Sequence, residues 1–177
     1  MQKKSSDEYY KPAEDTLFLA DNIQNEKGST ALDIGTGSGL LAKVLSENFS
    51  FVVSTDINFN ALKKAHEIVE NCICCNAADT LNCNFDLVVC NLPYLPSEEI
   101  DDCAVDGMTE GLGVATNIIQ SASKTIRQNG KLVYLTSTLA HYQELVRRTE
   151  NLGFSVKILA RKKLFFEELV LVECVRL

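Results

Sequence analysis

The hydrophobic positions of this chain fall into two patterns that alternate along its length. In one pattern, β-branched and other apolar residues form short runs, which are typical of buried strands. In the other, apolar residues recur at helical spacing, which predicts helices with one buried face. Because helices are expected between most of the strands, we predict an α/β protein with a mainly parallel sheet. The expected strands are 30–34, 51–55, 72–75, 85–90, 131–136, 154–160 and 169–175.

Five helices are expected, at residues 14–23, 40–48, 62–69, 112–128 and 139–152. In the fourth, apolar residues recur four positions apart, at Val114, Ile118, Ala122 and Ile126. Gly130 is expected to end this helix before the next strand. The connection between the last two strands is too short for a crossover helix, so these strands should pair antiparallel. The sheet is therefore expected to be parallel except for a final hairpin.

Composition narrows the function classes. A chain of 177 residues with 46% hydrophobic residues can bury one substantial core, so residues 1–177 are expected to form a single domain with a short N-terminal extension. The net charge of −7 argues against a surface that binds nucleic acid directly. The sequence contains no apolar signal core and no stretch as long as a membrane span, so a cytoplasmic protein that does not bind membranes is expected.

The seven cysteines are expected to be reduced thiols, because their number is odd and the sequence carries no secretion signal. Cys72, Cys74, Cys75 and Cys83 lie close together in the sequence and raise the possibility of a zinc site. The Cys-x-Cys-Cys spacing on a strand does not match the paired spacings of structural zinc sites. Small buried core residues are the favoured interpretation, and no metal is predicted.

A glycine-rich loop follows the first strand, with Asp33 ahead of Gly35, Gly37 and Gly39. Glycines at this place allow a tight turn and a close approach of the backbone to a ligand. A nicotinamide fingerprint would require a further glycine where this chain has Leu40. The spacing therefore favours a different nucleoside cofactor, with an ordinary glycine-rich turn as the alternative.

Carboxylates follow the next two strands. Asp56 ends the second strand, where a carboxylate can accept hydrogen bonds from both hydroxyls of a ribose. Ala78 and Asp79 follow the third strand, where a carboxylate or a backbone group could contact the amino group of an adenine. A solvated turn is the alternative for Asp79. These positions indicate a nucleoside ligand without identifying it.

The run Asn91-Leu92-Pro93-Tyr94 directly follows the fourth strand. The Asn91 side-chain oxygen and the Leu92 carbonyl are two acceptors that could bind the two N–H groups of a planar amide. Tyr94 could cover the flat face of that amide. Asn91 is also expected to lie against the nucleoside cofactor that the glycine-rich loop would hold. A simple turn after a strand is the alternative interpretation.

These motifs together resemble class I S-adenosylmethionine-dependent methyltransferases. The loop beginning at Asp33 is similar to their motif I, and the run beginning at Asn91 is similar to the Asn-Pro-Pro-Tyr motif of enzymes that methylate planar nitrogen, including the HemK family of glutamine methyltransferases. Residues 10–16, Tyr-Lys-Pro-Ala-Glu-Asp-Thr, resemble a segment of the archaeal and eukaryotic HemK branch, in which Thr16 is expected to lie over the cofactor. Leu92 departs from the pattern, which has proline there; we interpret it as a tolerated variant.

The resemblance implies a Rossmann-like fold with a mainly parallel seven-stranded sheet, a C-terminal antiparallel hairpin and helices on both faces. It implies S-adenosylmethionine as the cofactor and, as the substrate, the glutamine of the Gly-Gly-Gln loop of a class 1 translation release factor. It also implies a small zinc-binding activator subunit. The third strand should lie at a sheet edge, and its apolar residues favour that subunit docking there, unless the chain's own N-terminus covers the edge.

Three other functions remain open at this stage. An N6-adenine methyltransferase shares the Asn91 motif, although the acidic composition and the absence of a target-recognition domain argue against it. A subunit that binds S-adenosylmethionine without catalysis is suggested by Leu92, and protein lysine methylation is the third alternative. Residues 106–111 could shape the substrate entrance or simply connect to the next helix.

Overall fold

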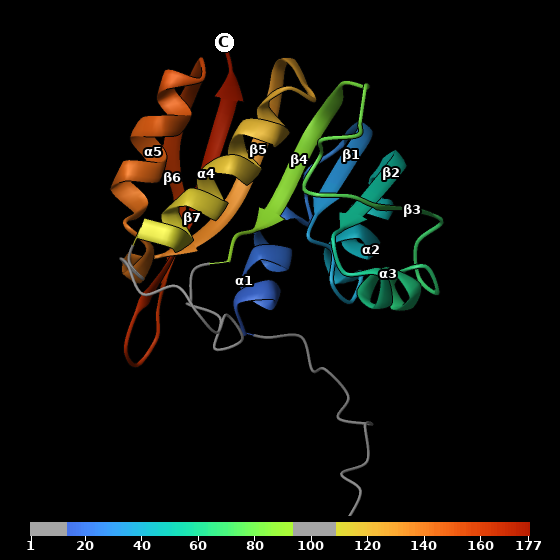
Figure 1. The fold of residues 1–177 in the computed structure, drawn as a ribbon, viewed down its shortest axis with the longest axis horizontal. Helices are drawn as coiled ribbons and strands as arrows, with labels where there is room; N and C mark the ends of the chain where they lie inside the picture. Colours follow the sequence, from blue (N-terminus) through green and yellow to red (C-terminus); the bar gives the residue numbers. More distant parts are fainter. Residues whose placement is uncertain (1–13, 94–108) are drawn as a thin grey trace, which may run out of the picture.

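The computed structural model describes residues 14–93 and 109–177, with one sheet and helices on both of its faces (Figure 1). The strands are β1 (Gly28–Ile34), β2 (Phe49–Asp56), β3 (Asn71–Cys74), β4 (Phe85–Asn91), β5 (Ile126–Ser137), β6 (Phe154–Lys163) and β7 (Glu168–Arg176). The helices are α1 (Glu14–Ile23), α2 (Leu40–Ser46), α3 (Phe59–Ala65), α4 (Thr109–Ser123), the 3₁₀ turn η1 (Thr138–Ala140) and α5 (Tyr142–Asn151).

The strand order is β3-β2-β1-β4-β5-β7-β6. Strands β1 to β5 pair in parallel, whereas β7 runs antiparallel to both β5 and β6. The predicted fold, a mainly parallel seven-stranded sheet closed by an antiparallel hairpin, is confirmed. The predicted position of β3 at a sheet edge is confirmed as well.

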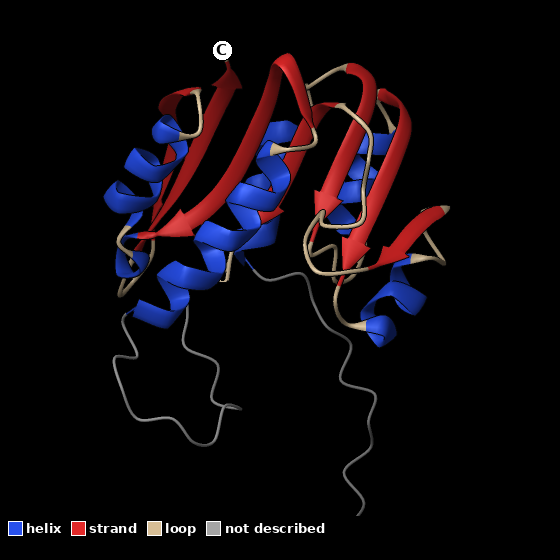
Figure 2. Cartoon of the chain, turned by 45° about the horizontal axis from the view of Figure 1, so that its top comes forward, coloured by secondary structure: helices blue, strands red, loops and turns tan. Residues whose placement is uncertain are grey.

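Helices cover both faces of the sheet (Figure 2), and the buried apolar side chains form two clusters. On one face, Leu19 of α1 and Leu41 and Leu45 of α2 pack with the strand residues whose side chains point to that face. On the other face, Ile119 of α4 and Leu145 of α5 pack with the alternate residues of the same strands. Side chains of successive strand residues point to opposite faces, and helices cover each face. The central strands are therefore buried on both sides.

Helix α1 forms as the sequence predicts. Glu14 and Asp15 occupy its first turn, where negative charge is favourable, and Leu19, Ala20 and Ile23 are buried. No helix within the described ranges is both long and apolar enough to span a membrane.

The prediction for the fourth helix was wrong at its C-terminal end. Helix α4 stops at Ser123, and Ile126 begins β5. The buried face is formed by Ala115, Ile119 and Ala122, whereas Val114 is half exposed. Gly130 lies inside β5, at the register shift where β5 bulges away from β4. A Cβ at Gly130 would lie 2.9 Å from the carbonyl oxygen of Phe85, so glycine serves close strand packing there and does not end a helix.

The fifth helix begins later than predicted. Residues 138–140 form the 3₁₀ turn η1, in which the N–H group of Leu139 donates to the Ser137 hydroxyl at 3.1 Å. His141 then adopts a left-handed conformation, with φ of 49°, and α5 starts at Tyr142. Gly153, with φ of 87°, follows the helix as expected for a C-terminal glycine.

Candidate active site

The predicted functional residues gather at the carboxyl edge of the sheet. Strands β1, β2 and β4 all end there, at Ile34, Asp56 and Asn91. The chain order reverses between β1 and β4, because β2 and β3 lie on one side of β1 while β4 and β5 lie on the other. Ligands of open α/β sheets bind at such a switch point.

The glycine-rich loop between β1 and α2 is held against the end of β2. The backbone N–H groups of Gly35 and Thr36 both donate to the carbonyl oxygen of Thr55, at 2.8 and 2.9 Å. Gly35, Gly37 and Gly39 have φ angles of 72°, 52° and 82°, a region that favours glycine. A Cβ at Gly39 would lie 3.2 Å from Cα of Ala65, so this glycine lets the loop pack closely on α3.

Asp33, which precedes the glycine loop, supports this loop from beneath. Its side chain is fully buried beneath the loop, where Oδ2 accepts hydrogen bonds from the Thr36 hydroxyl at 2.7 Å and from the Ala42 backbone at 3.1 Å. It therefore holds the loop and the start of α2. Burial raises the pKa of Asp33 to about 6.

Asp56 lies beside the glycine loop, as predicted, and also shapes it. One carboxylate oxygen accepts a hydrogen bond from Gly37 N–H at 2.9 Å, and the other accepts one from Asn58 N–H at 2.8 Å. Each carboxylate oxygen has a second lone pair, so the group can still accept hydrogen bonds from a ribose. The ribose contact stays a prediction, and the hydrogen bond to the loop was not predicted.

The residues after β3 are engaged with α4. Ala78 is buried, and its N–H donates to the Ser121 hydroxyl at 3.1 Å. The same hydroxyl donates to Asp79 at 2.5 Å, and Asn76 donates to the other oxygen of Asp79 at 3.0 Å. The hydrogen bond from Ser121 lowers the pKa of Asp79. An adenine contact through the Ala78 N–H is not available in this arrangement, whereas Asp79 is exposed.

Asn91 is positioned by the first turn of α1. Its Nδ2 group donates to Oδ2 of Asp15 at 3.1 Å and to the hydroxyl of Thr16 at 3.3 Å. A carboxylate can only accept, so Asp15 fixes which way round the Asn91 amide lies. Asn91 Oδ1 is buried, and no described residue donates to it.

The role of Asp15 in holding Asn91 was not predicted from the sequence. Its place in the Glu-Asp-Thr segment could have indicated that it belongs to the site. The hydroxyl of Thr16, which is predicted to lie over the cofactor, accepts a hydrogen bond from Asn91.

The remaining residues of the Asn91 motif differ in their surroundings. Leu92 is 1% exposed, and its side chain belongs to the core on the α4 side. Its N–H donates to the carbonyl oxygen of Leu135 at 3.1 Å. A proline at this position could not make that hydrogen bond, so Leu92 has a structural role here that the family's proline cannot have. Pro93 is exposed. Tyr94 and residues 106–108 lie outside the described residues.

The clustered cysteines were predicted to be small core residues, and this is wrong for two of them. Cys75 is buried and Cys72 is intermediate, but Cys74 and Cys83 are exposed. Within the described residues, no group of three or more His, Cys, Asp and Glu side chains is arranged to hold a metal ion.

The glycine loop leaves room for a ligand at the carboxyl edge. A Cβ at Gly35 would meet no atom within 4 Å, and one at Gly37 would meet only a backbone oxygen at 4.0 Å. The loop backbone therefore faces open space on the side of Asp56. A carboxylate and a bare backbone suit a ligand with hydroxyls and positive charge.

This sheet, with its last strand inserted antiparallel beside a parallel core, is the Rossmann-like fold of class I methyltransferases. The Mtq2–Trm112 complex of E. cuniculi, described as responsible for methylation of the eRF1 translation termination factor, includes a chain of the same fold. The TM-score is 0.78 at 26% sequence identity, and the match covers 96% of this chain and 99% of the other.

The sequence profile of the methyltransferase small domain family matches residues 11–165, and the chain belongs to this family of enzymes. A protein of Methanocaldococcus jannaschii, provisionally named a protein N5-glutamine methyltransferase, is 31% identical over 183 residues, which cover 96% of this chain and 93% of that protein. A release factor glutamine methyltransferase of Bradyrhizobium diazoefficiens is 30% identical over 122 residues, 57% of this chain and 41% of the relative.

Proposed function

We propose that the protein transfers a methyl group from S-adenosylmethionine to the side-chain amide nitrogen of the Gly-Gly-Gln glutamine in a class 1 translation release factor. The observation that supports this most strongly is the Asn91 amide. Its Nδ2 group is committed to Asp15, and its Oδ1 atom is buried without a donor among the described residues. An unpaired buried acceptor costs about 1–3 kcal/mol, so the site suits a substrate that brings an N–H group.

The target nitrogen is a weak nucleophile because its lone pair is delocalised into the amide carbonyl. Asn91 Oδ1 accepts one amide N–H and the Leu92 carbonyl accepts the other, which together fix the plane of the amide. Bound S-adenosylmethionine supplies an electrophilic methyl group on its sulfonium. A new N–C bond then forms as the S–C bond breaks, and the nitrogen loses one proton to solvent. Catalysis relies on orientation, so no general base is required among these residues.

The cofactor would be held by the glycine loop and by carboxylates around it. The Gly35 and Gly37 backbone allows close approach, and Asp56 accepts hydrogen bonds from the ribose. Asp33 contributes negative charge from beneath the loop. Asp79, which is exposed, would meet the adenine ring. Gly39 supports the loop through its packing on α3.

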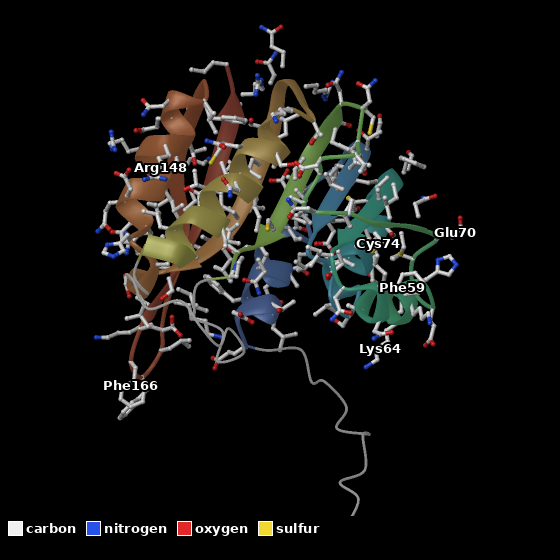
Figure 3. The ribbon with its side chains drawn as sticks, in the orientation of Figure 1. Phe59, Lys64, Glu70, Cys74, Arg148 and Phe166 are labelled. Carbon is white, nitrogen blue, oxygen red and sulfur yellow. The ribbon has the colours of Figure 1, made fainter. Side chains whose placement is uncertain are left out.

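A partner subunit would cover the β3 edge. In the described part of the chain β3 pairs only with β2, which leaves its outer backbone edge open. Ile73 is 36% exposed there, and Cys74 is exposed beside it (Figure 3). An uncharged, apolar edge of this kind normally needs protection. The partner of the E. cuniculi relative supports a small activator subunit here, and we propose that it binds zinc.

Asn91→Ala tests the proposed reaction. Methyl transfer to a purified release factor should fall by about tenfold or more, because the hydrogen bond that orients the target amide is lost. The affinity for S-adenosylmethionine, measured by calorimetry, should stay within about twofold, because the lost acceptor serves the amide. Asn151→Ala, at an exposed position of α5, is the matched control and should change neither quantity. Normal turnover by Asn91→Ala, or methylation of nucleic acid in place of the release factor, would contradict the proposal.

A further inference from the structure

Phe165 and Phe166 form the tip of the β6–β7 hairpin, and Figure 3 shows Phe166 pointing into solvent. Phe165 is 91% exposed and Phe166 is 86% exposed. Their rings contact each other edge to face, with centroids 4.6 Å apart. The backbone N–H of Leu164 donates to the carbonyl oxygen of Glu167 at 2.8 Å, which closes the turn around them.

The composition of this turn is not explained by its conformation. Turns of this length are normally formed by Gly, Asn, Asp, Pro or Ser, each of which favours the local geometry. Two adjacent aromatic residues offer no such advantage, and their exposure costs hydrophobic free energy. Exposed apolar side chains that gather at one place commonly mark a site where another molecule binds, so the tip has the character of a docking surface.

The register of the sheet places this tip on the same edge of the sheet as Asn91, but at some distance from it. Asn91 is paired with Leu135, Leu135 with Leu171, and Leu171 with Ala160, so these four residues form one row across β4, β5, β7 and β6. Three strand spacings separate the ends of that row by about 14 Å. Strand β6 continues for three residues beyond this row, about 10 Å, and the turn that carries the two phenylalanines follows it.

Strand β6 runs parallel to β5, because both are antiparallel to β7. The hairpin therefore projects from the carboxyl edge, on the side from which Asn91 must be reached. In Figure 1 it extends past the ends of β4 and β5. A folded protein that inserts a loop at Asn91 would meet this projection, whereas a single glutamine side chain would not.

Salt bridges hold the base of the hairpin in place. Lys162 pairs with Glu14 of α1 at 2.8 Å. Arg161 pairs with Glu168 at 2.6 Å and donates to the Tyr142 hydroxyl at 2.9 Å. These pairs neutralise two of the three consecutive basic residues near the tip. The surface is therefore mainly apolar, which suits a protein better than the phosphates of a nucleic acid.

We propose that the Phe165–Phe166 tip is a docking element for the protein substrate and inserts into an apolar depression of the release factor beside its Gly-Gly-Gln loop. This inference rests on the proposed function and adds a second contact remote from the methyl-transfer site. Adjacent aromatic anchors commonly dominate the binding energy of an interface.

The test is the double variant Phe165→Ser/Phe166→Ser, assayed with its partner subunit when the two copurify. The KM for a purified release factor and the Kd from direct binding should each rise by about tenfold or more. The kcat and the affinity for S-adenosylmethionine should stay within about twofold, because the tip contacts neither the target amide nor the glycine loop. Leu177→Ser, which removes a 75% exposed leucine beyond the far end of β7, is the control and should leave KM unchanged.

Failure of this inference differs from failure of the proposed function. If the wild-type enzyme methylates the release factor and the double variant has the same KM and Kd, the docking role alone would be overturned. A wild-type enzyme that never methylates the release factor would overturn the proposed function, and the direct binding measurement would then still decide the docking role. Loss of binding to phosphatidylcholine–phosphatidylserine vesicles, with unchanged Kd for the release factor, would assign the tip to a membrane and overturn the inference.

Discussion

Leu92→Pro should destabilise the protein although it restores the residue that related motifs carry. The substitution removes the hydrogen bond from the Leu92 N–H to Leu135, whose carbonyl is then left buried without that donor. An unpaired buried acceptor costs about 1–3 kcal/mol. The leucine side chain is 1% exposed, and its partial replacement by a smaller ring adds about 1 kcal/mol. The expected loss in free energy of unfolding is about 3 kcal/mol.

Thermal unfolding is the direct assay. For a chain of this size, about 3 kcal/mol corresponds to a fall in Tm of roughly 6–12 °C. Leu92→Met keeps both the N–H group and the bulk, so it should cost less than about 1.5 kcal/mol. Methyl transfer per folded molecule at 25 °C should persist in Leu92→Pro, because the carbonyl proposed to accept a hydrogen bond from the substrate is retained. A Tm equal to that of the wild type would refute the role assigned to the hydrogen bond.

Three further predictions concern charge and the partner surface. Because the pKa of Asp33 is raised to about 6 from an ordinary value of 3.8, the folded protein holds its proton more tightly than the unfolded chain does. Its contribution to stability is therefore greatest below about pH 4 and falls by up to about 3 kcal/mol as the pH rises through 6. In Asp33→Asn this dependence of the free energy of unfolding on pH, measured by urea titration, should disappear. An unchanged dependence on pH would contradict the assignment. Asp56→Ala should weaken S-adenosylmethionine binding in calorimetry by at least about 1.5 kcal/mol, and unchanged affinity would show that Asp56 does not hold the ribose. Ile73→Lys should abolish copurification with the activator while Ile158→Lys, equally exposed on the opposite edge strand, should not; equal behaviour of the two would argue against docking on β3.

Patterns of neighbouring residues in the sequence predicted those parts of the site whose conformation depends on neighbouring residues alone. The glycine loop was predicted correctly in position because its residues are adjacent in sequence and need left-handed backbone angles wherever the rest of the chain lies. Asp15 was missed because its hydrogen bond joins residues 76 positions apart. Gly130 was misinterpreted because the bulge that requires it depends on the neighbouring strand β4, and a glycine after an apolar helical run looks the same in either case.

The burial of Asp33 also could not be read from its sequence context. An acidic residue ahead of a glycine loop suits both a direct ligand and a support beneath the loop. Only the packing of α2 over β1, which brings the Ala42 N–H within 3.1 Å of the carboxylate, distinguishes the two roles. The strand positions were easier to predict, because burial on both faces of a parallel sheet leaves a continuous apolar run.

The place of β7 in the sheet has a consequence for synthesis on the ribosome. Strand β7 is made after β6 but lies between β6 and β5. Until β7 has emerged, β6 therefore lacks the one strand with which it pairs in the described chain, and the edge of β5 is open. Val170, Leu171 and Val172 are fully buried in the finished protein, so a nascent chain that pauses before them exposes the apolar surface they cover. Chaperone binding during translation should accordingly concentrate on the interval between β6 and β7, after the strands that carry the methyl-transfer site have already formed.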